Sequence, residues 1–317
     1  MNQEVKVKIL DTQVEHIDIT AFDSRPIIEA YSKMAFQARN LARASRIADQ
    51  MISEPDTAVI LCLAGSLFSA GLKQVVLDMV RHNMVDVLVS TGAVMVDQDF
   101  FEALGFRHYQ GNPFANDHAL MEQMVDRIYD TYINEEELRV CDHTVRDIAG
   151  TLPAQPHSSR EFIRGMGRYL DKNLPEADSV VLEAYRKGVP IFVPAFSDCS
   201  AGLGLVMHQW NQQKAKKPAL SIDSAKDLLE LTRIKMEAKE SGLIMIGGGA
   251  PKNFAQDVPV AADLISGELT MHKYAIQITV ADERDGALSG STLKEAHSWG
   301  KVDKGDEQMV LDRKSVV

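Results

Sequence analysis

Short apolar runs alternate with longer amphipathic segments along this chain. Runs rich in aliphatic and β-branched residues occupy residues 58–64, 85–90, 190–194, 243–246 and 274–280. Polar and apolar positions at helical spacing occupy residues 26–52, 72–82, 159–173 and 224–241. Near-continuous apolar strands separated by such helices are typical of a parallel sheet buried on both faces. We therefore predict an α/β fold, a Rossmann-like, doubly wound and mostly parallel sheet with helices on both faces.

Local signals refine the expected elements. Pro26 follows two residues that can cap a helix, Asp23 and Ser24. Asp223 can cap the helix that follows it, and Gly242 is expected to end that helix. We interpret residues 108–156 as an excursion on the sheet that contains a helix over residues 120–133. Residues 1–317 are predicted to form a single domain, in which a helical segment (residues 1–55) packs on the α/β core.

Composition excludes some classes of function. Apolar residues make up 45% of the chain, which supports a large buried core. The formal charge of −11 argues against nucleic-acid binding, which requires a basic surface. A negative field would attract polyamines, but most acidic proteins are acidic simply for solubility.

Signals for targeting and redox state point to the cytoplasm. The N-terminus has no basic segment followed by an apolar one, and no apolar run approaches the roughly 18 residues of a membrane helix. Cys62, Cys141 and Cys199 are unclustered, which suits a reducing compartment. We expect a cytoplasmic protein without membrane contact.

Four turns rich in small residues follow four of the predicted strands. They carry Ser66 and Ser69, then Thr91 and Gly92, then Asp198 and Ser200, and finally Gly247, Gly248 and Gly249. In open parallel sheets, ligands bind beyond the carboxyl ends of the strands. Small residues in the first turn would let backbone N–H groups approach a phosphate. The spacing matches neither the dinucleotide fingerprint nor the P-loop, so ordinary tight turns remain an equal interpretation.

A further cluster of candidate residues lies near the end of the chain. It contains Asp285, Glu295, Trp299 and Lys301. Taken singly, such a lysine is usually on the surface and such a tryptophan is usually in the core. An aromatic face beside a carboxylate nevertheless suits an alkylammonium group. A partly desolvated lysine beside a cationic substrate would be a usable nucleophile.

Metal chemistry has little support in the sequence. Cys141, Asp142 and His143, together with His108 and His118, have no recognised zinc spacing. We predict no metal site.

Several segments of the chain are distinctive. They are FQA at residues 36–38, HNMVDVLV at residues 82–89, Pro194 and Ala195 with Asp198 and Ser200, the triple glycine with Lys252, and SWGK at residues 298–301. Through these segments the chain resembles the deoxyhypusine synthase family over roughly residues 20–305. The resemblance implies a homotetramer of Rossmann-like subunits with NAD and substrate sites at subunit interfaces. It also implies that NAD oxidises a polyamine such as spermidine, that 1,3-diaminopropane is lost, and that a lysine carries the aminobutyl group as an imine.

The resemblance assigns roles to individual residues. Lys301 matches the imine-forming lysine, and Trp299 and Glu295 match residues that hold the amine. Residues that match the NAD site are Ser66, Ser69, Thr91, Asp198, Ser200, Gly247, Gly248, Gly249 and Asp285, and Gly92 lies beside them.

Three positions in the expected substrate pocket depart from the family. Leu203 and Leu288 stand where the family has carboxylates, and Asn253 stands where it has a histidine. Asparagine cannot act as a general base near neutral pH. Because an unpaired buried ammonium is costly, we expect the family's chemistry on a different amine pair. The pattern of these departures resembles the bacterial deoxyhypusine synthase-like proteins.

Three hypotheses follow. The favoured one is an NAD-dependent aminobutyl or aminoalkyl transferase that acts on small polyamines or diamines, for example making homospermidine or spermidine. The alternatives are an authentic deoxyhypusine synthase that modifies a lysine of a translation factor, and a catalytically silent NAD-binding scaffold.

Overall fold

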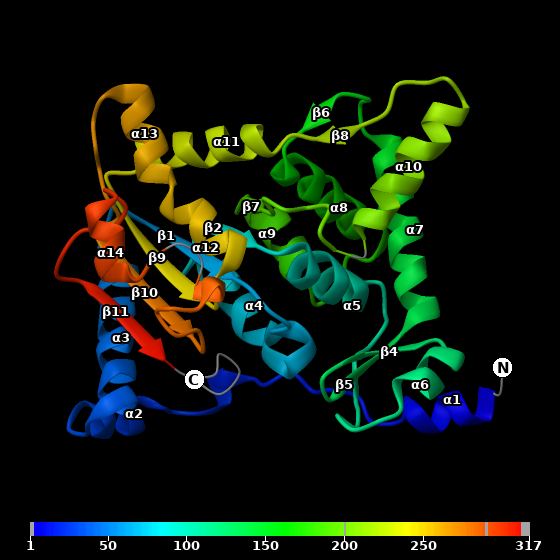
Figure 1. The fold of residues 1–317 in the computed structure, drawn as a ribbon, viewed down its shortest axis with the longest axis horizontal. Helices are drawn as coiled ribbons and strands as arrows, with labels where there is room; N and C mark the ends of the chain where they lie inside the picture. Colours follow the sequence, from blue (N-terminus) through cyan, green and yellow to red (C-terminus); the bar gives the residue numbers. More distant parts are fainter. Residues whose placement is uncertain (1–2, 200, 289–290, 312–317) are drawn as a thin grey trace.

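A six-stranded parallel sheet forms the centre of the protein (Figure 1). The computed structural model describes residues 3–199, 201–288 and 291–311. The strand order is β11-β10-β9-β1-β2-β7, and every neighbouring pair is parallel. The strands are β1 (Thr57–Leu63), β2 (Val87–Ser90), β7 (Ile191–Phe192), β9 (Glu240–Ile246), β10 (Tyr274–Thr279) and β11 (Glu307–Leu311). The predicted α/β class is confirmed.

Helices cover both faces of this sheet because side chains of each strand alternate between two cores. In β1, Val59, Leu61 and Leu63 join one core, whereas Ile60 and Cys62 join the other. The first core includes α3 (Phe36–Ser53), α4 (Lys73–Arg81), α8 (Ser159–Asn173) and α9 (Val180–Lys187). The second includes α11 (Ser224–Glu237), α12 (Gly249–Gln256), α13 (Val258–Ser266) and α14 (Leu293–Ser298).

Residues 108–156 differ from the prediction. They contain an antiparallel sheet of order β3-β5-β4, with β3 (Tyr109–Gln110), β4 (Val125–Ile128) and β5 (Thr131–Asn134). The helix predicted over residues 120–133 is wrong, since only α6 (Asp117–Glu122) and the hairpin β4–β5 lie there. Met124 and Tyr129 adopt φ of 55° and 52°, which ends any helix at those positions. The helix α7 (Glu135–Thr151) follows.

The N-terminal segment forms two helices where one is predicted. These are α2 (Arg25–Ser32) and α3, and Phe36, with φ of 53°, lies at the break between them. Buried residues of α3, such as Ile47 and Met51, join the first core. The expectation that Gly242 ends a helix is also wrong: α11 ends at Glu237, and Gly242 lies inside β9 against the Met51 side chain.

The remaining elements connect these layers. They are α1 (Gln3–Ile9), η1 (Ile19–Ala21), η2 (Phe68–Leu72), η3 (Ala93–Phe100), α5 (Phe101–Ala103), β6 (Pro156–His157), α10 (Gly202–Lys214), β8 (Ser221–Ile222) and η4 (Gly286–Leu288). The strands β6 and β8 form a small parallel pair outside the central sheet.

Candidate functional site

The four predicted turns lie along one edge of the central sheet. The ends of its strands are in register, because Leu63 of β1 pairs with both Ser90 of β2 and Ile246 of β9. Ile246 pairs in turn with Ile278 of β10. All these strands are parallel, so the turns that follow them share the carboxyl edge, where open α/β sheets bind ligands.

Neighbouring turns contact one another along this carboxyl edge. The Ala64 amide donates to the Ile246 carbonyl at 3.0 Å, which joins the first turn to the triple glycine. A Cβ atom on Gly92 would lie 2.6 Å from the Cys199 sulfur, so the second turn packs closely on the third. Gly247 and Gly249 adopt φ of 93° and 66°, which favours glycine at both positions. Ser200 lies outside the described residues.

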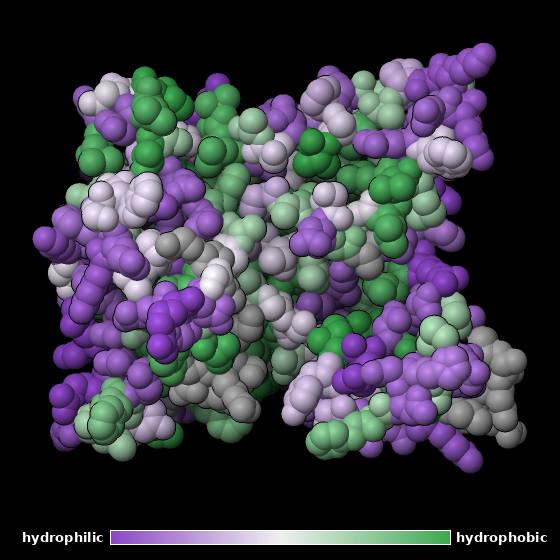
Figure 2. All heavy atoms as spheres, in the orientation of Figure 1, coloured by the Kyte–Doolittle hydropathy of each residue, from purple (hydrophilic) through white to green (hydrophobic). Residues whose placement is uncertain are grey.

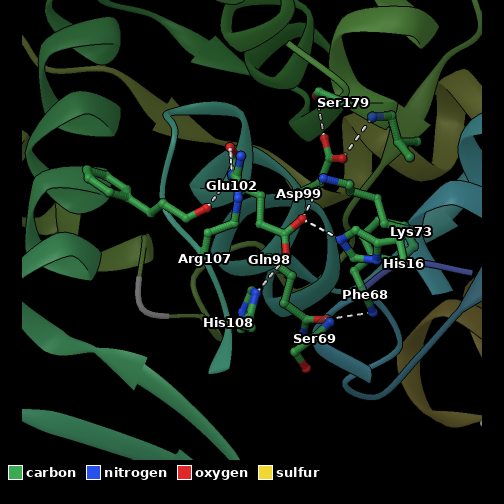
Figure 3. A network of polar contacts seen from close by, with 12 residues as sticks. His16, Phe68, Ser69, Lys73, Gln98, Asp99, Glu102, Arg107, His108 and Ser179 are labelled. Carbon is green, nitrogen blue, oxygen red and sulfur yellow. Dashed lines mark hydrogen bonds and ion pairs between the residues drawn. The ribbon is translucent and has the colours of Figure 1, made fainter. Parts of the chain in front are cut away.

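Hydrogen bonds from within the protein fix the backbone of the first turn. The side-chain oxygen of Gln98 accepts hydrogen bonds from the amides of Phe68 at 2.9 Å and Ser69 at 3.0 Å (Figure 3). The Ser69 hydroxyl donates to the Ser66 carbonyl, and Ser69 is buried. These two amides are therefore engaged by Gln98, so a phosphate at this turn would have to be approached by its other amides.

A buried charge cluster stands behind the same turn (Figure 3). One carboxylate oxygen of Glu102 lies 2.5 Å from the Lys73 nitrogen and 2.7 Å from Nε2 of His16. The other oxygen lies 2.7 Å from Nδ1 of His108. Burial raises the pKa of Glu102, but the hydrogen bonds from His108 and His16 and the charge of Lys73 outweigh it. The pKa therefore lies well below its ordinary value, and Glu102 stays ionised.

This cluster fastens the N-terminal strap, residues 11–22, beside the first turn. His16 belongs to the strap, and the Ile17 amide donates to the Gly71 carbonyl at 3.0 Å. A Cβ atom on Gly71 would lie 2.6 Å from the Glu15 carbonyl oxygen, so the strap and the turn are in close contact. The strap thus forms part of the boundary of the carboxyl edge.

Lys301 occupies a corner formed by an acid and an aromatic ring. Its nitrogen lies 2.7 Å from a carboxylate oxygen of Asp257 and 5.4 Å from the centre of the Trp299 ring. The Lys301 side chain is only 12% exposed, whereas Trp299 is 66% exposed. The predicted combination of carboxylate, aromatic face and partly desolvated lysine is present, although the carboxylate is not the predicted Glu295.

The backbone around Gly300 directs Trp299 and Lys301 into this corner. Gly300 has φ of 71°, and a Cβ atom there would lie 3.2 Å from the Leu269 side chain. The Lys301 amide donates to the Ala296 carbonyl at 3.0 Å, and its carbonyl accepts from the His272 amide at 3.0 Å. His272 precedes β10, so the Lys301 backbone lies at the amino end of that strand.

Within one chain, this corner is therefore separated from the carboxyl edge. Helix α12 begins at Gly249 in the triple glycine and ends just before Asp257. Its eight residues span about 12 Å at about 1.5 Å per residue. The turn residues and the lysine corner thus form two half-sites at opposite ends of one helix.

Lys252 is a second buried cation near Lys301. It donates to the carbonyls of Leu288 at 2.7 Å and Ser291 at 2.5 Å. Burial, followed by the charge of Lys301, lowers the pKa of Lys252 to about 8, against a smaller opposing effect of Glu295. Lys252 thus ties the loop after β10 to α12 and adds positive charge beside the lysine corner.

The other predicted substrate-pocket residues are dispersed. The Leu288 side chain is only 3% exposed, so it packs in the interior rather than facing a ligand. The Asn253 side-chain oxygen is buried and accepts no hydrogen bond from the described residues. Leu203 is 55% exposed on α10, which packs on α7, away from α14 (Figure 1). Hydrophobic side chains gather over α10 and over α13 on the face shown in Figure 2.

Glu295 and two acids at the carboxyl edge are exposed. The Glu295 carboxylate accepts from the Thr292 amide at 2.7 Å in a capping box, and this hydrogen bond lowers its pKa. Asp198 and Asp285 are exposed in their loops. These positions are compatible with ligand contact, and their roles stay predictions.

Sequence reasoning missed Asp257. It directly precedes Val258 and Pro259, a pattern that reads as an ordinary helix cap. Asp257 does occupy the N-cap position of α13, but its side chain makes no capping hydrogen bond and instead meets Lys301. Since the two residues are 44 positions apart, no local spacing signals the contact.

The described part of the chain has no helix long and apolar enough to span a membrane. Among these residues there is also no cluster of three histidine, cysteine or acidic side chains that could hold a metal ion.

Sequence comparisons with known proteins identify one family. The profile of deoxyhypusine synthase matches residues 26–314. The chain is 59% identical to a "Deoxyhypusine synthase-like protein" of Chlorobaculum parvum, over 98% of this chain and 88% of that protein. It is 41% identical to "Probable deoxyhypusine synthase 2" of Methanosarcina acetivorans, over 90% of this chain and 81% of that protein.

A solved structure supports the fold. A crystal structure from Entamoeba histolytica, named as a proposed deoxyhypusine synthase, superposes with a TM-score of 0.61 at 17% identity. The superposition covers 96% of this chain and 93% of that one. The sequence matches by themselves show that the chain belongs to the deoxyhypusine synthase family, a family of transferases.

Proposed function

We propose that this protein is an NAD-dependent transferase that moves an aminobutyl or similar aminoalkyl group between small polyamines or diamines through an imine on Lys301. The observation that carries the proposal is the setting of Lys301: nearly buried, 2.7 Å from Asp257 and beside the exposed face of Trp299. A lysine amine is the nucleophile that forms such an imine, and the carboxylate and aromatic ring beside it would bind the cationic chain of an amine substrate.

The open backbone at the carboxyl edge supports the proposal that a dinucleotide binds there. A Cβ atom at Gly249 would meet only the Pro251 ring, at 3.9 Å, so the backbone there is open to close approach. Ser66, Thr91 and Asp198 lie in the other turns of the same edge and would contact NAD with the glycines. When bound, NAD would accept a hydride from the carbon next to the amine nitrogen, which leaves an imine.

The chain's own residues then account for transfer. The neutral Lys301 amine forms a bond to the imine carbon, and the departing amine leaves with a proton. The aminoalkyl group remains on Lys301 as an imine until a second amine attacks the same carbon and releases the lysine. The imine on the second amine would then take the hydride back from the reduced dinucleotide, which gives the product amine. Trp299 would hold the cationic chain by cation–π attraction while these bonds exchange.

We also propose that the two half-sites meet between copies of the chain in a homotetramer. Support comes from the separation of about 12 Å between the triple glycine and Asp257 along α12. Lys301 of one copy beside the carboxyl edge of another would bring the amine to the dinucleotide without rearrangement of either chain.

Chemical trapping tests the transfer. The protein is incubated with NAD and a panel of diamines and polyamines, treated with borohydride, and analysed by mass spectrometry of its peptides. We expect an aminoalkyl adduct on Lys301 that is absent in Lys301→Arg, because a guanidinium cannot form this imine. Lys304→Arg is the matched control, since Lys304 is exposed three positions along. No adduct with any donor would contradict the proposal.

Modification of a protein lysine is the second candidate. It is favoured by the accessibility of Trp299, which is 66% exposed beside the exposed side chain of Leu269. Incubation with labelled spermidine and host lysate separates the two: a labelled translation-factor band supports a deoxyhypusine synthase proper, and labelled small amines alone support polyamine transfer. Neither product, with NAD bound, would indicate a silent scaffold.

A further inference from the structure

A cavity of about 250 Å³ lies between α8, α9 and the start of β7. These three elements lie side by side in Figure 1, and α8 contacts both α9 and β7. Residues 188–191 line the cavity, so it lies at the amino end of β7, whereas the third turn of the carboxyl edge follows the other end of that strand. The cavity is therefore separate from both half-sites described above.

The floor of this cavity is apolar. Ile163 of α8, Val181 and Ala184 of α9 and Ile191 of β7 line it, and all four side chains are buried. Gly188, which follows α9, has φ of 73°, and no atom lies within 4 Å of the position of an added Cβ atom, so this side of the cavity is open. The floor would bury the apolar part of a small molecule that enters from this side.

Two guanidinium groups border the same cavity. Arg160 and Arg164 both line it and are four positions apart, on one face of α8. Glu230 accepts from Nε of Arg160 at 2.7 Å and from the Ser158 hydroxyl at 3.0 Å, which fixes the position of the Arg160 guanidinium. Arg164 is exposed and forms neither a hydrogen bond nor an ion pair with any described residue. Its guanidinium is therefore available to a ligand.

The charge of the lining favours an anion. The described residues that line the cavity include the two arginines and no acidic residue, in a chain whose formal charge is −11. Tyr185 also lines the cavity, and its hydroxyl forms no hydrogen bond with a described residue. A guanidinium presents two parallel N–H groups that match the two oxygens of a carboxylate. The cavity thus combines a carboxylate-binding border with an apolar floor.

We propose that this cavity is a binding site for a small monocarboxylate with an apolar body. Arg164 would bind the carboxylate, with Arg160 beside it, and the floor would receive the apolar body. The volume is slightly below the roughly 300–1,000 Å³ of sites for drug-sized ligands, which limits the ligand to a small molecule. An α-amino acid is disfavoured, because its ammonium group would meet no acidic residue in the described lining.

Saturation-transfer difference NMR with phenylacetate tests the site on the full chain. Two further probes separate the contributions, since phenylacetamide keeps the ring without the charge and acetate keeps the carboxylate without the ring. We expect phenylacetate to bind about 10-fold or more tightly than either probe. The reason is that a charge-assisted hydrogen bond and the burial of a ring each contribute roughly that much.

Variants of α8 locate the binding. Arg164→Met should weaken phenylacetate binding about 10-fold or more, and Arg164→Lys should give an intermediate affinity, because the charge remains and the paired N–H groups are lost. Arg168→Met is the matched control, since Arg168 is exposed on the same helix and is not part of the described lining. It should bind phenylacetate as tightly as the unmodified protein.

Equal affinity of Arg164→Met and the unmodified protein for phenylacetate would overturn the proposal, and so would an equal loss in Arg168→Met. Phenylacetamide or acetate that binds within twofold of phenylacetate would show that the proposed ligand class is wrong. Arg164 lies outside both half-sites, so Arg164→Met should leave borohydride trapping on Lys301 unchanged. The carboxylate site and the proposed transfer can therefore fail independently of each other.

Discussion

Replacing Glu102 by glutamine should strongly destabilise the protein. Glu102 is the carboxylate that Lys73, His16 and His108 share, and the side chains of Lys73 and Glu102 are 7% and 4% exposed. Glutamine is nearly isosteric, so the substitution removes charge rather than volume. It leaves the Lys73 ammonium buried without its carboxylate, for which we expect a loss of about 3–5 kcal/mol in the free energy of unfolding.

Urea unfolding followed by circular dichroism measures this loss. With a slope of about 3 kcal/mol per molar urea, the midpoint should fall by about 1 M or more. Asp56→Asn is the control, because the Asp56–Lys239 pair is exposed and should leave the midpoint unchanged. A double variant, Glu102→Gln with Lys73→Met, should recover part of the loss, since no buried ammonium then lacks Glu102. The recovery is incomplete because Lys73 also lowers the pKa of the buried Asp99 carboxyl. A change below about 1 kcal/mol in Glu102→Gln would refute the reasoning.

The same substitution predicts a pH dependence of defined sign. The pKa of Glu102 is lower in the folded chain than its ordinary value of 4.5. Its contribution to stability is therefore present above pH 4.5 and is lost as the pH falls through the folded pKa. The difference in stability between the unmodified protein and Glu102→Gln should narrow in acid. A difference that stays constant from pH 7 to pH 3 would contradict the assigned ionisation.

Two other substitutions probe the lysine corner. The pKa of Lys252 is lowered from 10.5 to about 8, chiefly by burial. Between pH 8 and pH 10.5 the unfolded chain therefore binds more protons than the folded chain, and the free energy of unfolding should rise with pH in this range. Lys252→Met should abolish this rise in unfolding midpoints, and a rise of unchanged size would show that another group causes it. Gly300→Ala places a Cβ atom at φ of 71° and 3.2 Å from Leu269. The substitution should lower the free energy of unfolding by about 1–2 kcal/mol and reduce borohydride trapping on Lys301. Gly286→Ala is the control, because there is open space around Gly286, and it should trap normally. Equal trapping by both variants would contradict the role of the turn at Gly300.

The sequence determined the class of the fold because the signal is local. In β1, residues on both faces are apolar, and both faces are covered by helices, as a near-continuous apolar run predicts. Helix α8 has the predicted bounds, and its capping box of Ser158 and Glu161 is a local signal. The small turn residues lie at strand ends for the same reason.

The predicted secondary structure is wrong where a contact with a residue distant in the sequence overrides the local conformational preference. Residues 120–133 have a helical pattern, yet the hairpin of β4 and β5 forms there and also pairs with β3. Gly242 resembles a helix end, but it lies in β9 because the side chain of Met51, nearly two hundred positions earlier, needs the space beside it. Patterns within a short window cannot report such partners.

In the candidate site, too, some features follow from the sequence and others only from the tertiary structure. Residue types and the family resemblance identified Lys301 and Trp299, and the turn at Gly300 brings these neighbours together. Only the tertiary structure decided that Asp257 is the carboxylate on Lys301, that Leu288 is interior, and that Gln98 occupies the amides of the first turn. The physical reason is that an ion pair or a hydrogen bond depends on where two side chains lie in space. That is set by how α12, α13 and α14 pack on one face of the sheet, whereas the sequence order fixes only the spacing within each element.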